Sequence, residues 1–122
     1  MSSPLQPIEG AAASTLEATA DDAQGLAALY AEALPPGWPA HELAASCADA
    51  NRAVLKAADG AHVHGFVILQ FAADEAEILA IAVAKDRRRR GLAASLLRGG
   101  LRACHNRFIS CIYLEVAESN TP

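Results

Sequence analysis

Four consecutive arginines, Arg87, Arg88, Arg89 and Arg90, stand directly before Gly91 at the junction of two apolar segments. The first segment, 78–83, has the composition of a strand, and the second, 92–97, that of the first turns of a helix. Cations at a helix N-terminus are unfavourable by roughly 0.3–1 kcal/mol each, because the free N–H groups there already carry partial positive charge. A bound phosphate would remove this conflict, and a glycine lets it approach the main chain closely. The pattern predicts a phosphate site.

Two other interpretations of the arginines stay open at this point. The run has the composition of a solvated basic cluster or of a nuclear-localisation-like patch. It is not a P-loop, since no Gly-Lys-Ser/Thr follows, and it lacks the three glycines of a dinucleotide-binding turn. The order strand, basic turn, glycine and helix favours the phosphate site over a charge run without context.

The distribution of charge supports a small anionic ligand. The chain has 122 residues, 52% of them hydrophobic, and a net charge of −4, which is typical of one globular domain. Residues 1–84 hold eleven acids and two bases, whereas residues 85–107 hold eight bases and one acid. A long polyanion needs a broad basic surface, and the run has no interleaved aromatic side chains, so we do not expect a nucleic-acid partner.

Cysteine usage and the N-terminus bear on location. Cys47, Cys104 and Cys111 are odd in number and form no Cys-x-x-Cys pair, which favours a reducing cytoplasm. We see neither a secretory signal nor an apolar run of about 20 residues, so no membrane association is expected.

The order of elements predicts an α/β (α+β) fold with a mixed sheet. Residues 1–13 are expected to form a flexible leader. Strands are predicted at 14–18, 52–57, 62–71, 77–83 and 108–116, and helices at 19–34, 40–48 and 91–104. Short turns between successive strands predict an antiparallel meander, and the helix at 91–104 predicts a right-handed crossover to a parallel last strand. Ligands in such sheets bind beyond the carboxyl ends of the strands.

The sequence also predicts the environments of several single side chains. Leu92, Leu96, Leu97, Leu101 and Cys104 are expected on one buried face of the helix that follows the arginines. Trp38 is expected to be a packing anchor, Cys104 and Cys111 to be core residues, and His62 and His64 to be surface histidines that share one face of a strand without binding metal.

Glu115 is the candidate for proton transfer. By the two-residue period it shares a strand face with Ile109, Cys111 and Tyr113, and apolar neighbours raise the pKa of a carboxyl group by desolvation. An acid at the exposed end of a strand is the equally weighted alternative.

From about Leu16 to the end, the chain resembles the Gcn5-related N-acetyltransferase (GNAT) family. That family's motif, Arg/Gln-x-x-Gly-x-Gly/Ala, appears as RRRGLA at 88–93, after Ile81, Ala82 and Val83. Within the family, the stretches LPPGW at 34–38 and LEVAESN at 114–120 resemble the bacterial enzymes that acetylate the N-terminal alanine of a ribosomal protein.

The resemblance implies an acetyl-CoA-dependent N-acetyltransferase that needs no metal. Its acceptor would be the N-terminal α-amine of a protein, with a ribosomal protein as the candidate. Glu115 would be the general base. The cofactor-binding residues would be Ile81, Ala82, Val83, Arg88, Arg89, Arg90, Gly91, Leu92, Ala93, Ala94 and Asn120. Backbone groups of 81–83 would bind the pantetheine and acetyl portion, and the turn would bind the pyrophosphate.

The sequence also departs from the family. A helix with a tyrosine general acid and two more strands ordinarily follow the position of Asn120, so we expect 14–122 to be a C-terminally truncated domain. The last strand would then present an apolar edge, through which the chain would dimerise or aggregate. Gly99 and Gly100 are unusual in a helix, because each glycine lowers helix stability by roughly 1 kcal/mol relative to alanine. A catalytically weak CoA-binding remnant and a phosphate- or nucleic-acid-binding module remain the alternative functions.

Overall fold

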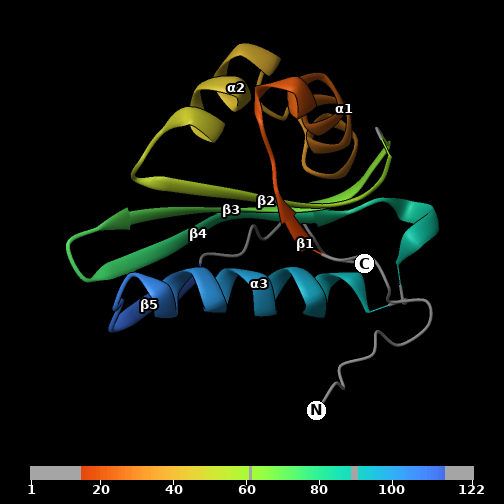
Figure 1. The fold of residues 1–122 in the computed structure, drawn as a ribbon. Helices are drawn as coiled ribbons and strands as arrows, with labels where there is room; N and C mark the ends of the chain where they lie inside the picture. The colour runs from red at the N-terminus through yellow and green to blue at the C-terminus, as the bar shows by residue number, and fades with distance from the viewer. Residues whose placement is uncertain (1–14, 61, 89–90, 115–122) are drawn as a thin grey trace.

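A five-stranded sheet lies between helices α1 and α2 on one face and helix α3 on the other (Figure 1). The computed structural model describes residues 15–60, 62–88 and 91–114. The strands are β1 (Thr15–Glu17), β2 (Arg52–Asp59), β3 (His62–Ala72), β4 (Glu75–Val83) and β5 (Cys111–Leu114). The helices are α1 (Ala23–Ala33), α2 (Ala40–Ala48) and α3 (Leu92–Asn106), with 3-10 turns η1 (Ala20–Asp22) and η2 (Lys85–Arg87). No helix in these described ranges is both long and apolar enough to cross a membrane.

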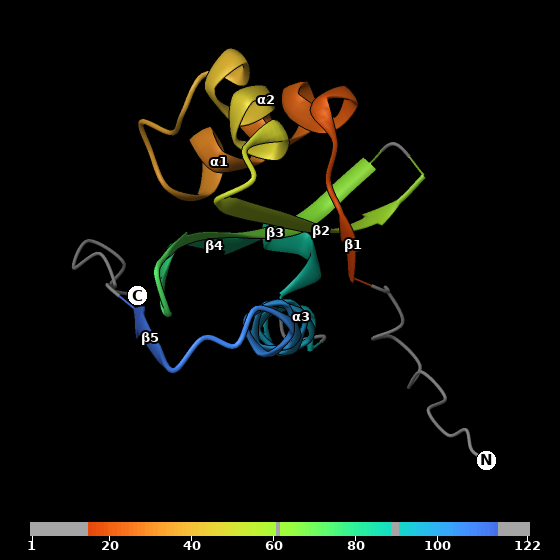
Figure 2. The same cartoon turned by 60° about the vertical axis from the view of Figure 1, so that its left-hand side comes forward.

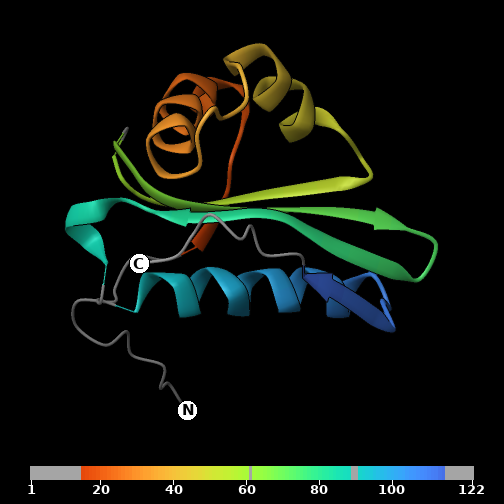
Figure 3. The ribbon, with the colours of Figure 1, turned by 180° about the vertical axis from the view of Figure 1, so that it is seen from behind.

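The predicted topology is confirmed. Strands β1 to β4 pair antiparallel in chain order, and β5 pairs parallel with β4 after the α3 crossover. This parallel pairing runs only from Glu75↔Cys111 to Ile78↔Leu114. Figure 3 shows β5 at the hairpin end of β4, whereas the turn into α3 leaves the opposite end. The second half of β4 therefore has no described strand along its outer edge.

The predicted start of the last strand at Phe108 is wrong. Helix α3 continues to Asn106, two residues beyond its predicted end, and Phe108 lies in the following turn with a φ of 57°. Its ring is 88% exposed. A positive φ is incompatible with an extended strand, so β5 begins only at Cys111.

An extra residue in β4 changes which side chains face which helix layer. Ile78 pairs with Leu69 and Ala80 pairs with Ile68, which leaves Leu79 as a bulge. Before the bulge, Ile78 packs in the core beneath α3. After it, Ala80 packs in the core beneath α1 and α2. The bulge thus re-aims the end of β4, the segment that precedes the basic turn.

Capping and aromatic packing hold the α1–α2 layer in place. The Thr19 hydroxyl accepts from the Asp21 N–H while the Asp22 carboxylate accepts from the Thr19 N–H, so the turn into α1 is doubly capped. Trp38 stacks on Tyr30 with ring centroids 5.4 Å apart, which agrees with its expected role as a packing anchor.

The buried face of α3 is narrower than predicted. It consists of Leu92, Leu96, Gly100 and Cys104. Leu97 and Leu101 are 36% and 52% exposed, so their assignment to the buried face is wrong. The glycines make close approach possible: a Cβ at position 100 would lie 3.4 Å from the Leu69 side chain. With its axis this near the sheet, α3 buries one row of residues. Figure 2 shows the helix end-on beneath the sheet.

Two further sequence expectations are corrected by burial. His64 is only 5% exposed, so it is not a surface histidine, and neither ring nitrogen has a hydrogen-bond partner among the described residues. It is the extra residue where the β2–β3 register shifts, and this bulge turns its side chain inward. Cys111 is exposed because β5 is the last described strand of the sheet, whereas Cys104 is buried as expected.

Candidate functional site

The turn between β4 and α3 exposes a helix N-terminus without a side-chain cap. Gly91 occupies the N-cap position with φ 81° and ψ 8°, a left-handed conformation that glycine adopts without strain. The first intrahelical bond runs from the Ser95 N–H to the Gly91 carbonyl. The N–H groups of Leu92, Ala93 and Ala94 precede that bond and are therefore free of intrahelical partners. Apart from its chain neighbours, a Cβ at position 91 would meet no described atom within 4 Å, so the space beside Gly91 is open.

The outer edge of β4 offers a second set of main-chain groups. The Ala84 N–H donates to the His64 carbonyl at 2.7 Å. Bonded and non-bonded pairs alternate along an antiparallel ladder, so the next pair, Gly65↔Val83, turns its polar groups outward. The same alternation turns the N–H and carbonyl of Ile81 outward. These groups face the part of β4 that β5 does not reach.

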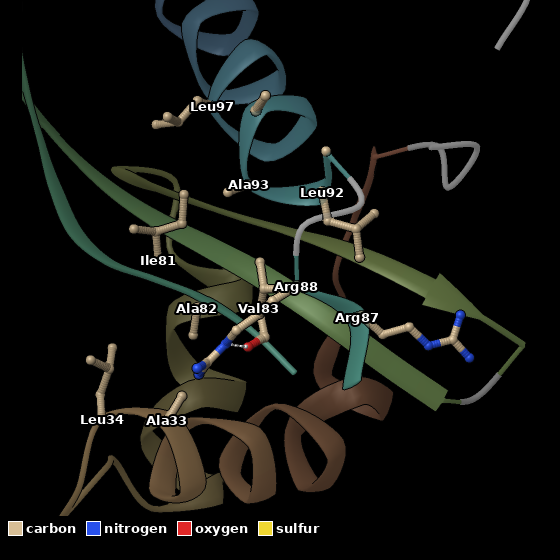
Figure 4. Close-up of a pocket in the computed structure, with 12 residues that line it drawn as sticks. Ala33, Leu34, Ile81, Ala82, Val83, Arg87, Arg88, Leu92, Ala93 and Leu97 are labelled. Atoms are coloured by element: carbon tan, nitrogen blue, oxygen red, sulfur yellow. Dashed lines mark hydrogen bonds between the residues drawn. The ribbon is translucent and has the colours of Figure 1, made fainter. Parts of the chain in front are cut away.

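One cavity of about 630 Å³ joins the free edge to the uncapped helix, and this volume is in the usual range for small-molecule sites. Its lining, shown in Figure 4, consists of Ala33, Leu34, Ile81, Ala82, Val83, Arg87, Arg88, Gly91, Leu92, Ala93, Ala94 and Leu97. The cavity reaches both sides of the sheet. Val83 and Leu92 belong to the core beneath α3, whereas Ala82 belongs to the core beneath α1 and α2.

The two described arginines of the run diverge. The Arg88 side chain folds back along the turn, and its Nε–H donates to the Val83 carbonyl at 3.1 Å. Figure 4 shows its guanidinium beside Ala82, directed toward Ala33 at the end of α1. The Arg87 guanidinium points the other way, toward the β2–β3 hairpin. There its positive charge, together with burial, lowers the pKa of His64, burial being the larger cause.

Most of the sequence-predicted cofactor residues converge on this cavity. Those lining it are Ile81, Ala82, Val83, Arg88, Gly91, Leu92, Ala93 and Ala94. Arg89, Arg90, Glu115 and Asn120 lie outside the described residues. Of the residues predicted to share the strand face of Glu115, Cys111 and Tyr113 are exposed and Ile109 is half-buried.

Four lining residues were absent from the predicted cofactor set: Ala33, Leu34, Arg87 and Leu97. Ala33 and Leu34 directly precede the Pro35-Pro36-Gly37 segment, which ends the helix. That turn was the available sign in the sequence that the end of α1 reaches the site. Leu97 was assigned to the core because helical periodicity alone does not show which side of a leucine stripe meets the sheet. Within the described ranges, no group of three or more His, Cys, Asp and Glu residues could hold a metal ion.

This geometry agrees with the comparisons. The model of the acetyltransferase (GNAT) family matches residues 23–122. The match covers most of the chain, and the protein therefore belongs to the GNAT acetyltransferase family, as the resemblance implied. No curated protein sequence matches the chain significantly.

Solved structures confirm the fold. The ribosomal-protein-S18-alanine N-acetyltransferase from Escherichia coli superposes with a TM-score of 0.77 at 23% identity, covering 88% of this chain and 69% of that one. The ribosomal-protein-alanine N-acetyltransferase from Brucella melitensis gives 0.72 at 22% identity, covering 87% and 81%. The PaiA N-acetyltransferase from Thermoplasma acidophilum, in complex with coenzyme A, gives 0.78 at 15% identity, covering 88% and 80%.

Proposed function

We propose that the protein transfers an acetyl group from acetyl-CoA to an amine. The cavity that joins the uncapped N-terminus of α3 to the free edge of β4 carries this proposal. The N–H groups of Leu92, Ala93 and Ala94 would bind the pyrophosphate, with Arg89 and Arg90 adding charge. The outward N–H and carbonyl of Ile81 would pair with the amide groups of the pantetheine chain, while the outward N–H of Val83 is left for the acetyl carbonyl.

The chemistry proposed is direct transfer. The neutral amine nitrogen forms a bond to the thioester carbonyl carbon, the carbon–sulfur bond breaks, and the products are an amide and CoA. Glu115 would take the proton lost by the amine, through water, and the Val83 N–H would polarise the carbonyl oxygen. Asn120 would order the site. These roles of Glu115 and Asn120 rest on the family motif.

For the acceptor we propose the N-terminal α-amine of a protein, with a ribosomal protein as the first candidate. The support is the fold shared with two ribosomal-protein-alanine N-acetyltransferases. A cavity that opens on both sides of the sheet also lets an acceptor approach from the α1 side while phosphates occupy the α3 side. The cysteine content favours a cytoplasmic location.

The decisive experiment is calorimetric titration with acetyl-CoA, CoA and a short RNA, followed by thiol-release assays with an N-terminal alanine peptide. We expect both coenzyme forms to bind and the RNA not to bind. Glu115→Gln should lower turnover by about 10²–10⁴-fold while leaving acetyl-CoA affinity nearly unchanged. Binding without turnover by the wild type would favour the CoA-binding remnant, and binding of RNA alone would contradict the whole proposal.

We also propose self-association through β5. Among the described strands β5 pairs with β4 alone, and Ile112 and Leu114 are 37% and 55% exposed. Unpaired main-chain groups beside apolar side chains recruit other strands. Light scattering should show a dimer that Ile112→Lys converts to a monomer. A wild-type monomer at high protein concentration would contradict this.

A further inference from the structure

Arg88 holds a positive charge on the acceptor side of the cavity, away from the phosphate-binding turn. Its Nε–H is bonded to the Val83 carbonyl, and this bond folds the side chain back toward the end of α1 (Figure 4). The neighbouring Ala82 side chain belongs to the core on the α1 face of the sheet. The guanidinium therefore lies across the sheet edge from Leu92 and Ala93, which line the cavity from α3.

The terminal nitrogens of this guanidinium have no hydrogen-bond partner among the described residues. Within residues 15–60, 62–88 and 91–114, only the Nε atom of Arg88 forms a hydrogen bond, and Arg88 forms no salt bridge. Its neighbours in the cavity, Ala33, Leu34 and Ala82, are apolar. Glu32, the acid nearest in sequence to the end of α1, lines a different cavity together with Lys85. Two N–H-bearing nitrogens in fixed orientation thus face the space an acceptor would enter.

From this arrangement we propose that Arg88 selects acceptors that carry a carboxylate next to the reactive amine. A planar guanidinium binds a carboxylate through two parallel hydrogen bonds, and the contact with Val83 fixes the orientation of the Arg88 guanidinium. The inference rests on the proposed acetyl transfer and deepens it by naming a property of the acceptor. The carboxylate can belong to an Asp or Glu side chain of a peptide or to a free amino acid.

The test compares acceptors that differ in one group. The peptides carry Ala-Glu or Ala-Gln at the N-terminus, and free alanine is paired with alaninamide to distinguish the two sources of the carboxylate. The wild type should prefer the charged member of at least one pair by about 10-fold in kcat/KM. Arg88→Gln should reduce this ratio to about one. Because the ratio compares two acceptors on one enzyme, a general loss of cofactor affinity does not change it.

Arg87→Gln is the matched control, because it removes the same charge from a side chain directed toward the β2–β3 hairpin. It should keep the wild-type ratio, whereas Arg88→Glu should favour an Ala-Lys peptide. Equal ratios for the wild type and Arg88→Gln, or equal losses in the Arg87 and Arg88 variants, would overturn the proposal. The same acceptor pairs are also compared by their binding affinities for the protein, with and without CoA. This second comparison does not depend on turnover. Failure to bind acetyl-CoA would contradict the proposed function separately.

Discussion

Gly99 of α3 lies directly against Thr15 of β1: a Cβ at position 99 would stand 2.8 Å from Thr15 Cγ2. The Thr15 hydroxyl also donates to the Ser95 carbonyl, one turn earlier on the same helix, at 3.3 Å. Strand β1 is only three residues long, and this contact ties it to a helix far away in the sequence. The glycine that weakens α3 locally therefore allows the helix to pack on the edge of the sheet.

The two adjacent glycines should respond differently to alanine. A methyl group at position 99 must displace Thr15 or Leu55, whereas at position 100 it meets only Leu69 at an ordinary contact distance of 3.4 Å. Overpacking costs about 1–3 kcal/mol, and replacing a helical glycine gains about 1 kcal/mol. In urea unfolding, Gly100→Ala should match or exceed the wild type and Gly99→Ala should fall below it. Equal gains for both variants would mean that the helix is not held by close contact with β1.

Gly91 should matter for ligand binding beyond its backbone strain. A β-branched residue at φ 81° is strained, which costs about 1–2 kcal/mol, and it would also crowd the phosphate position. Gly91→Val should lower acetyl-CoA affinity at least about 10-fold in calorimetry. Gly60→Val is the matched control, because Gly60 also has a positive φ, of 64°, and open surroundings, but lies in the β2–β3 turn. Equal losses of affinity in both variants would indicate a global effect of strain.

Asp22 should make stability fall in acid. Burial raises the pKa of its carboxyl group, but hydrogen bonds from Lys56 and Thr19 outweigh burial, so the pKa lies below its usual 3.8. The unfolded chain then takes up the proton first, and the stabilisation present above about pH 4 is lost as the pH falls through the folded-state pKa. Asp22→Asn should cost about 1–3 kcal/mol at pH 7 and remove this acid dependence.

Exposed Asp21, the adjacent residue, provides the comparison for Asp22. Its carboxylate forms no hydrogen bond or salt bridge among the described residues. Asp21→Asn should therefore leave both the stability at pH 7 and the acid limb of the unfolding profile close to wild type. An equal effect in the two variants would mean that net charge, and not the pairing of Asp22 with Lys56 (2.7 Å), is responsible.

His64 should limit stability at mildly acidic pH. Burial, followed by the charges of Arg87 and His62, lowers its pKa, while Asp59 and Asp86 oppose the shift more weakly. Unfolded histidine takes up a proton near pH 6.5, so stability is full above that pH and falls as the pH drops toward the folded-state pKa. His64→Leu should abolish this loss and also remove two unpaired buried nitrogens. Thermal melts from pH 5 to 8 measure this loss of stability. The variant His41→Gln, at an exposed histidine, should keep the pH dependence of the wild type.

Local patterns predicted most elements. The helix at 40–48 and the strand starting at Arg52 are found as predicted, since proline, glycine and the change of hydrophobic period mark such boundaries. The cofactor-site residues between Ile81 and Ala94 that the structure describes share one cavity, because a strand, a glycine turn and a helix are contiguous in the chain. The start of the last strand was the weakest prediction, since the positive φ of Phe108 has no local sequence cause.

By itself, then, the sequence determined the order of elements and the chemistry of the turn, because both depend on residues close together along the chain. Only the tertiary structure decided which leucines of α3 are buried, that His64 turns inward at a bulge, and that the Arg88 guanidinium is directed toward the end of α1. These outcomes depend on how closely α3 approaches the sheet and where the strand registers shift. Such distances come from packing between segments far apart in the sequence, and no periodicity within one segment encodes them.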